Sequence, residues 1–137
     1  MIVVLDASGA AEIIAKTAYG ADFYNVMMHA DKVIAPDLYI SETANIAWKH
    51  GRKDRDNAKS YIEESNNCID FIDEFASSLE LRIEALRLAQ EHDHSVYDML
   101  YAALARRYDA VLVTMDVKLR EVCKKISVRV RELYPDL

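Results

Sequence analysis

IVVLDAS, residues 2–8, is the stretch that decides the fold of this chain. It opens with four apolar residues in a row, most of them β-branched, which is typical of a strand buried on both faces of a parallel sheet. Asp6 follows directly, and ligands of such sheets gather at the carboxyl ends of the strands. A second stretch of this kind, VLVTMD at residues 111–116, ends in Asp116. The two stretches predict an α/β sheet with an acidic residue after each of two strands.

The rest of the chain alternates helical and strand patterns. Gly20 is expected to end the first predicted helix. Further strands are predicted at residues 33–35 and, at a sheet edge, at residues 128–130. Strands that alternate with helices imply an α/β fold with a mainly parallel central sheet and right-handed crossovers. Apolar residues at three- and four-residue spacing predict helices over residues 9–19, 22–30, 38–50, 54–75, 79–92, 96–108 and 117–125.

Length and composition limit the class of protein. A chain of 137 residues fits one domain, which we expect to span residues 1–137. Cys68 and Cys123 lie in no CxxC pair, so reduced thiols in a cytoplasmic protein are expected. The start of the chain has no basic segment before its apolar run, and no run approaches the roughly 18 apolar residues of a membrane span. We therefore expect neither a signal peptide nor a membrane segment.

Four acidic residues stand in motifs that can aim a carboxylate inward. Asp6 and Asp116 follow strands, whereas Glu42 in SETANIAWK and Asp98 in SVYDMLYAALA lie on predicted helices with apolar faces. Two carboxylates about 4 Å apart repel by roughly 4 kcal/mol at an effective dielectric near 20, so such a cluster needs a cation or raised pKa values. Oxygen ligands without Cys or His partners favour Mg²⁺ or Mn²⁺. The set predicts a metal site suited to phosphodiester hydrolysis.

Each of these acids also has a purely structural interpretation. Asp6 and Asp116 could cap the helices that follow them. Ser95 and Asp98 form an S-x-x-D capping box, although a carboxylate at a helix N-terminus can cap the helix and bind a metal at once. Glu42 lies beside an apolar face and could reach solvent or pair with a base. The sequence by itself leaves these alternatives open.

At these four acids the chain resembles the PIN-domain ribonucleases, and in size and layout it is similar to the VapC-type toxins of toxin–antitoxin pairs. The resemblance implies a three-layer α/β/α fold and a Mg²⁺- or Mn²⁺-dependent endoribonuclease in which the four carboxylates hold the metal and catalyse the reaction. It also implies a homodimer and a small VapB-like antitoxin that inhibits the nuclease. It gives supporting roles to three polar residues, Ser8, Asn45 and Thr114.

The formal net charge of −6 hides two basic groups, one within residues 117–133 and one within residues 49–55. Basic side chains near a nuclease site are candidates for binding RNA phosphates. The alternative is that each is part of an ordinary solvated face. The candidates for RNA binding are Lys118, Arg120, Lys124, Lys125, Lys49, Arg52 and Lys53.

Other functions are alternatives to this hypothesis. A PIN-fold nuclease of RNA processing, or a catalytically inert RNA-binding PIN module, would share the fold. A phosphoryl-accepting receiver domain would need an acidic pair after the first strand, and a haloacid-dehalogenase phosphatase would need DxD where this chain has Asp6-Ala7-Ser8. The four histidines, His29, His50, His92 and His94, show no metal spacing with any Cys and are interpreted as surface or turn residues.

Overall fold

β1 (Ile2–Leu5) lies inside a four-stranded, fully parallel sheet with the strand order β3-β2-β1-β4. The computed structural model describes residues 1–134 of the chain. Val3, Val4 and Leu5 are completely buried, as the apolar run predicts for a strand covered on both faces. The other three strands are β2 (Lys32–Pro36), β3 (Glu74–Ala76) and β4 (Val111–Val113).

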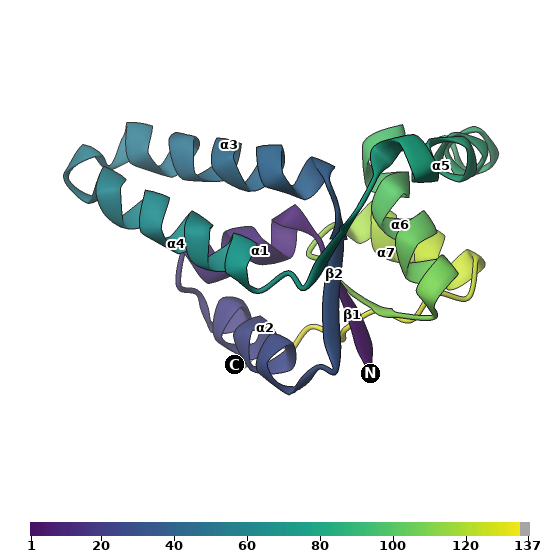
Figure 1. The fold of residues 1–137 in the computed structure, drawn as a ribbon, viewed down its shortest axis with the longest axis horizontal. Coiled ribbons are helices and arrows are strands. Elements are labelled where there is room, and N and C mark those ends of the chain that lie inside the picture. The colour runs from purple at the N-terminus through teal and green to yellow at the C-terminus, as the bar shows by residue number, and fades with distance from the viewer. Residues whose placement is uncertain (135–137) are drawn as a thin grey trace.

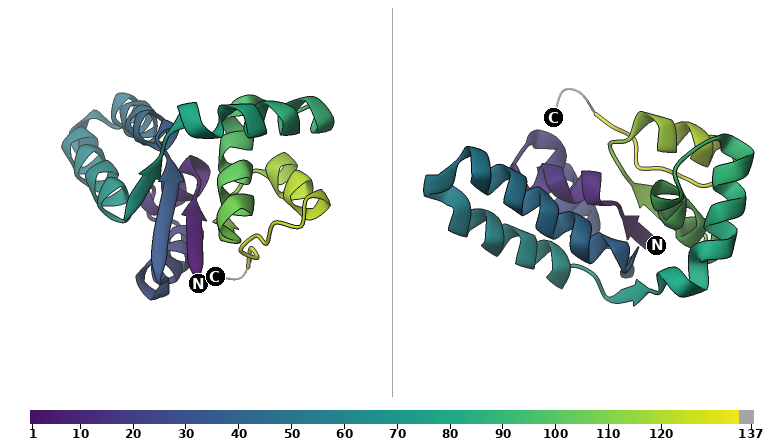
Figure 2. Two further views of the ribbon diagram at one scale, coloured as in Figure 1. Left: turned by 45° about the vertical axis from the view of Figure 1, so that its right-hand side comes forward. Right: turned by 90° about the horizontal axis from the view of Figure 1, so that it is seen from above.

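Helices cover both faces of the sheet, so the molecule has the three layers that were predicted (Figure 1). Figure 2 shows α1 to α4 on one side of the sheet and α5 to α7 on the other. The first layer consists of α1 (Ala7–Ile14), α2 (Ala18–His29), α3 (Leu38–Lys53) and α4 (Ala58–Asp70). The second consists of α5 (Ser78–His92), α6 (Val96–Tyr108) and α7 (Val117–Lys125).

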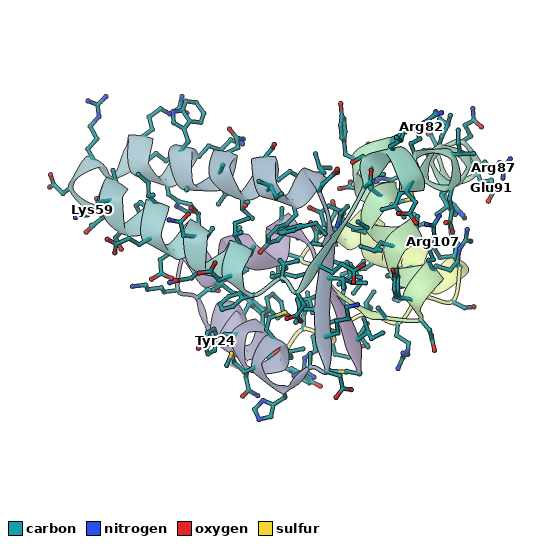
Figure 3. All side chains as sticks on the ribbon, in the orientation of Figure 1. Tyr24, Lys59, Arg82, Arg87, Glu91 and Arg107 are labelled. Atoms are coloured by element: carbon teal, nitrogen blue, oxygen red, sulfur yellow. The ribbon has the colours of Figure 1, made fainter. Side chains whose placement is uncertain are left out.

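α6 is the central helix of the second layer. Every residue from Met99 to Ala105 is buried, and the helix contacts β1, β2 and β4 as well as its two neighbouring helices. Leu81, Ala85 and Leu88 bury the inner face of α5 against it. Ion pairs at the surface link the same two helices, and Figure 3 shows Arg107 of α6 near α5. Exposed pairs contribute only about 0–1 kcal/mol each, so apolar burial holds α5 in place.

The first helical layer departs from the prediction at Gly20. The chain breaks between α1 and α2 at residues 15–17, and Gly20 lies inside α2, where its N–H donates to the capping Thr17 hydroxyl at 3.1 Å. A Cβ atom on Gly20 would lie 2.1 Å from the carbonyl oxygen of Glu12. The expectation that Gly20 ends a helix was therefore wrong: this glycine lets two helices approach closely.

The predicted helix over residues 54–75 was also wrong in part. A short 3-10 turn, Arg55–Asn57, precedes α4, and the chain after Asp70 turns into β3. Asp73 docks this segment on β2, because its backbone N–H donates to Val33 O at 2.8 Å and its carboxylate accepts from Val33 N at 2.7 Å. The edge strand expected at residues 128–130 is reduced to one bridge between Leu112 and Val130.

No helix within residues 1–134 has the length and apolar character needed to cross a lipid bilayer. All strands of the sheet are parallel, so their carboxyl ends meet at one edge. At this edge β1 leads into α1, β2 into α3 and β4 toward α7. A backbone hydrogen bond links the ends of β1 and β4 there, because the Asp6 N–H donates to Val113 O at 3.0 Å. This edge is where the predicted acids come together.

Candidate active site

The carboxyl edge of the sheet carries an open cavity of about 360 Å³. It brings together all four predicted acids from four separate stretches of the chain. Asn45 and Lys49 line it from α3, beside Glu42. Thr114 is fully buried and joins the site through its hydrogen bond to Asp6. The residues lining the cavity are Asp6, Ala7, Ser8, Ala11, Glu42, Asn45, Ile46, Lys49, Asp98 and Asp116.

The Asp6 carboxylate is fixed by two hydroxyl groups. Thr114 Oγ1 donates to its Oδ2 at 2.5 Å, and Ser8 Oγ donates to the same oxygen at 3.0 Å. The Ser8 N–H donates to Oδ1 at 3.2 Å, so Asp6 also caps α1. Ser8 and Thr114 are in turn held by the backbone N–H groups of Met115 and Asp116, at 2.9 and 3.1 Å. These two polar residues thus fix the orientation of the Asp6 carboxylate, while their supporting role in catalysis stays a prediction.

Burial changes the acidity of Asp6. Only 5 % of the residue is exposed, and this desolvation raises the pKa of its carboxyl group to about 6. The negative charge of Asp98 acts in the same direction. Hydrogen bonds from Thr114 and Ser8 favour the ionised form and offset part of the shift. A nearby cation would stabilise the ionised form of such a buried carboxyl group.

Glu42 reaches the cavity from the middle of α3 and is half-buried. Tyr101 of α6 donates its hydroxyl hydrogen to Glu42 Oε1 at 2.6 Å. Desolvation, and to a smaller degree the charge of Asp98, raise the Glu42 pKa. Tyr101 is a residue of this site that the sequence did not predict. Its position one helical turn after Asp98 was the signal that it faces the same site.

Asp98 and Asp116 both take part in helix capping, and both also line the cavity. The Asp98 N–H donates to Ser95 Oγ, which lies 3.4 Å from both the Asp98 backbone nitrogen and Asp98 Oδ2, as in a capping box. Asp116 caps α7 by accepting from Leu119 N at 3.0 Å. Both carboxylates nevertheless line the cavity. Burial, followed by the charge of Asp116, raises the Asp98 pKa.

His94, which was interpreted as a surface or turn residue, lies beside these acids. It is in the turn between α5 and α6, but only 10 % of its side chain is exposed. Its Nδ1 accepts from Ser95 N at 2.9 Å and lies 3.4 Å from Asp98 Oδ2. The sequence indicated the turn correctly but gave no sign of its burial.

Only two of the seven candidate RNA-binding residues border the acidic site. Lys49 lines the main cavity, and Lys118 lines an adjoining hollow that shares Asp98 and Asp116 with it. Arg120 instead donates to the carbonyl oxygens of Thr114 and Arg131, at 3.3 and 2.9 Å. The other four, which line neither hollow, are Arg52, Lys53, Lys124 and Lys125.

The donor set of the cavity fits a hard divalent cation. Its four carboxylates are oxygen donors, no Cys or His lines the main cavity, and three of the acids have raised pKa values that a cation would lower. The carboxylates surround the cavity without forming a closed cage. Across residues 1–134, no three His, Cys, Asp or Glu side chains form a group close enough to hold an ion. A metal would therefore have to draw these acids together.

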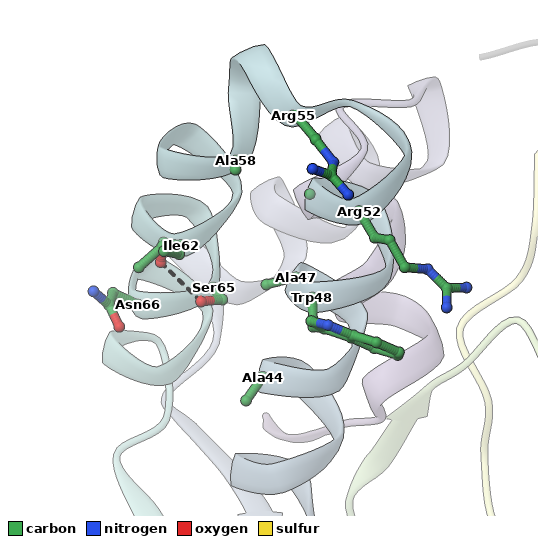
Figure 4. A pocket seen from close by; sticks show the side chains of 10 residues that line it. Ala44, Ala47, Trp48, Arg52, Arg55, Ala58, Ile62, Ser65 and Asn66 are labelled. Carbon is green, nitrogen blue, oxygen red and sulfur yellow. Dashed lines mark hydrogen bonds between the residues drawn. The ribbon is translucent and has the colours of Figure 1, made fainter.

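A second, larger cavity of about 590 Å³ lies between α3 and α4 (Figure 4). Trp48 and Ile62 are 56 % and 58 % exposed beside it, and small residues such as Ala47 and Ala58 line it between them. Arg52 lies over the Trp48 ring at 4.7 Å, and Arg55 lines the end nearest the turn between the helices. We call this surface the α3–α4 groove.

Comparison with known proteins places this chain in a family. The PIN-domain model matches residues 3–125, so the chain belongs to the PIN-domain family, as the four acids predicted. Ribonuclease VapC3 from Pyrobaculum aerophilum is 30 % identical over 127 residues, which are 88 % of this chain and 94 % of that protein. Within the family the chain is therefore of the VapC type.

Two solved structures share the fold. PAE2754 from Pyrobaculum aerophilum matches with a TM-score of 0.67 and 26 % identity, over 89 % of this chain and 87 % of that one. VapBC2 from Rickettsia felis, bound to a DNA fragment from its promoter, matches with a TM-score of 0.67 and 16 % identity, over 96 % and 98 %. The second similarity, at its low identity, concerns the fold alone.

Proposed function

We propose that this protein is a divalent-metal-dependent endoribonuclease that acts as the toxin of a VapB–VapC-type pair. The observation that carries the proposal is the meeting of four carboxylates in one cavity of a PIN-family fold, with Asp6 buried and its pKa raised to about 6. The name of the relative from Pyrobaculum, a ribonuclease, supports the substrate class. The single domain, the homodimer and the cytoplasmic location stay predictions.

Asp6, Glu42, Asp98 and Asp116 are the residues that would hold Mg²⁺ or Mn²⁺ in this cavity. When bound, such an ion supplies an activated water and neutralises charge on the phosphate. The chain's own contribution is to fix its ligands: Ser8 and Thr114 hold Asp6, and helix caps hold Asp98 and Asp116. Asn45 and Lys49 line the same cavity, where they can bind the substrate phosphate.

The test is cleavage of a labelled RNA oligonucleotide. We expect internal cleavage with Mn²⁺ or Mg²⁺ that EDTA abolishes. An RNA that is bound but never cut would favour the inert PIN module instead. If the purified protein cuts RNA but the product of the adjacent gene does not inhibit it, the RNA-processing alternative would be favoured.

We further propose that the RNA strand runs across the acidic cavity from Lys49 to Lys118. These two lysines lie in neighbouring hollows that share Asp98 and Asp116, so phosphates on either side of the cleaved one can reach them. Lys53 and Lys125 are exposed lysines that line neither hollow, and they serve as matched controls.

Lys49→Gln and Lys118→Gln are expected to weaken RNA binding in EDTA, where no cleavage occurs. Each should reduce the slope of log affinity against log salt by about 0.7, the value for one lost phosphate contact on a single strand. Lys53→Gln and Lys125→Gln should change the slope much less. Fluorescence anisotropy at several salt concentrations provides the measurement. Equal effects in all four variants would show that the lysines act only through overall charge.

The α3–α4 groove is the surface that we propose for a VapB-like antitoxin. A segment with apolar side chains between Trp48 and Ile62, and with carboxylates that reach Arg52 and Arg55, complements its shape and charge. α3 also carries Glu42 and Lys49, so an occupant of the groove lies next to the acidic cavity. Binding there can block access of RNA to the site.

Ile62→Asp is expected to weaken binding of the antitoxin encoded beside this gene at least about tenfold, because burying an unpaired carboxylate exceeds the roughly 1.4 kcal/mol that corresponds to that factor. Met28→Asp is the matched control, because Met28 is 59 % exposed on α2 and outside the groove. Calorimetry measures both affinities, and RNA cleavage by free Ile62→Asp should stay normal. Unchanged affinity in Ile62→Asp would place the antitoxin elsewhere.

A further inference from the structure

A hydrogen bond from Tyr101 to Glu42 joins the two helical layers across the acidic cavity. The two oxygens are 2.6 Å apart, with the donor on α6 and the acceptor on α3. Tyr101 is only 1 % exposed, whereas Glu42 is half-buried and lines the cavity. The hydroxyl therefore meets the carboxylate from the interior of the protein, and the carboxylate faces the cavity.

The Tyr101 hydroxyl is a permanent donor. A tyrosine hydroxyl keeps its hydrogen at neutral pH, so it donates rather than accepts when it meets a carboxylate. A buried hydroxyl also requires a hydrogen-bond partner, and Glu42 accepts from it. This hydrogen bond therefore fixes the Tyr101 hydroxyl and the Glu42 carboxylate relative to each other.

Glu42 differs from the other acids in how it is held. Asp6 and Asp116 each accept a hydrogen bond from a backbone N–H of the helix that they cap, and Asp98 accepts one from the hydroxyl of the nearby cap residue Ser95. Glu42 lies in the interior of α3, where backbone N–H groups are used within the helix. Within the described part of the chain its carboxylate has one side-chain hydrogen bond, from Tyr101 to Oε1, which leaves Oε2 for a ligand in the cavity.

We propose that Tyr101 is a positioning residue that holds the Glu42 carboxylate toward the divalent cation of the proposed nuclease. Because α6 also carries Asp98 one turn earlier, the same rigid helix sets the place of two of the four acids. Partners that orient a metal ligand in this way affect metal affinity by about 10- to 100-fold. This inference rests on the proposed function.

The test is the affinity for Mn²⁺ alone, measured without RNA by electron paramagnetic resonance of the free ion. Tyr101→Phe removes only the hydroxyl and should weaken Mn²⁺ binding by about tenfold or more. Tyr39→Phe is the matched control, because Tyr39 is equally buried but donates to the carbonyl oxygen of Cys68 outside the cavity, at 2.7 Å. It should lose stability yet keep its Mn²⁺ affinity.

A double mutant separates positioning from general damage. In a Glu42→Gln background, Tyr101→Phe should weaken Mn²⁺ binding no further, because the ligand that it positions is gone. Equal affinities of Tyr101→Phe and the wild type would overturn the inference and leave the proposed function intact. A wild type that binds no Mn²⁺ would refute the proposed function itself.

If Tyr101→Phe does not fold, the wild type can still give the answer. With ¹³Cζ-labelled tyrosine, the Tyr101 resonance should shift when Mg²⁺ is added, because its acceptor then shares charge with the ion. The Tyr39 resonance should not move. Mg²⁺ binding that leaves the Tyr101 resonance in place would contradict the proposal.

Discussion

Asp6→Asn and Asp98→Asn are each expected to lower Mn²⁺-dependent RNA cleavage by about a hundredfold or more. The substitutions keep the side-chain volume but remove a negative charge from the acidic cavity, and loss of a mere partner of a metal ligand already costs about 10- to 100-fold. Both helices should stay capped, since Asn is a good N-cap for α1 and the Ser95 cap of α6 remains. The measurement is the single-turnover rate with saturating RNA.

Asp109→Asn is the control for this experiment. Asp109 lies at the end of α6 in a left-handed conformation that Asn adopts readily, and its side chain is 94 % exposed and outside the cavity. It should cleave RNA at the wild-type rate. If Asp6→Asn or Asp98→Asn cleaves RNA at the wild-type rate, the substituted residue is not part of the active site.

The second large effect concerns stability without metal. The Asp6 pKa is about 6 in the folded protein against an ordinary value of 3.8. Between these values the unfolded chain releases a proton that the folded chain retains, so folding becomes less favourable as the pH rises from about 4 to about 7. A shift of about two units, at roughly 1.4 kcal/mol each, corresponds to about 3 kcal/mol.

Asp6→Asn does not ionise, so its stability relative to the wild type should increase by about 2–3 kcal/mol over this pH range. Urea unfolding in EDTA at both ends of the range measures the difference. Hydrogen bonds that the amide alters change the free energy of unfolding equally at both ends of the pH range. They therefore cancel in this comparison. Added Mn²⁺ at neutral pH should then stabilise the wild type more than the variant. Parallel pH profiles of the two proteins would show that Asp6 ionises normally.

The elements that the sequence predicted well are those whose local pattern reflects their burial. IVVL is apolar throughout because β1 is covered on both faces, and SVYDMLYAALA is apolar on nearly all sides because α6 contacts the sheet and two helices. β3 has no such pattern. Its three residues form a strand because Asp73 binds the edge of β2, which is a contact between distant parts of the chain.

The same distinction applies to the site. The place of Asp6 and Asp116 could be predicted because strand ends of a parallel sheet share one edge, whereas Glu42 and Asp98 were added on the resemblance to the family. The role of Tyr101 could not, since a tyrosine on an apolar helix face looks like any core residue until the Glu42 carboxylate is seen opposite. Lys118 and Arg120 are both basic residues of α7, but only the structure shows that Arg120 is bound to backbone carbonyls.

The order of the strands along the chain has a consequence for how the protein is made. β4 and Asp116 are synthesised after the other three strands of the sheet, and Thr114, which orients Asp6, comes with them. A nascent chain on the ribosome thus carries Asp6, Glu42 and Asp98 without the strand that completes their cavity. At about 5–20 residues per second, the first half of the chain precedes β4 by several seconds. We therefore expect the acidic cavity to be incomplete on the nascent chain until β4 and α7 have emerged from the ribosome.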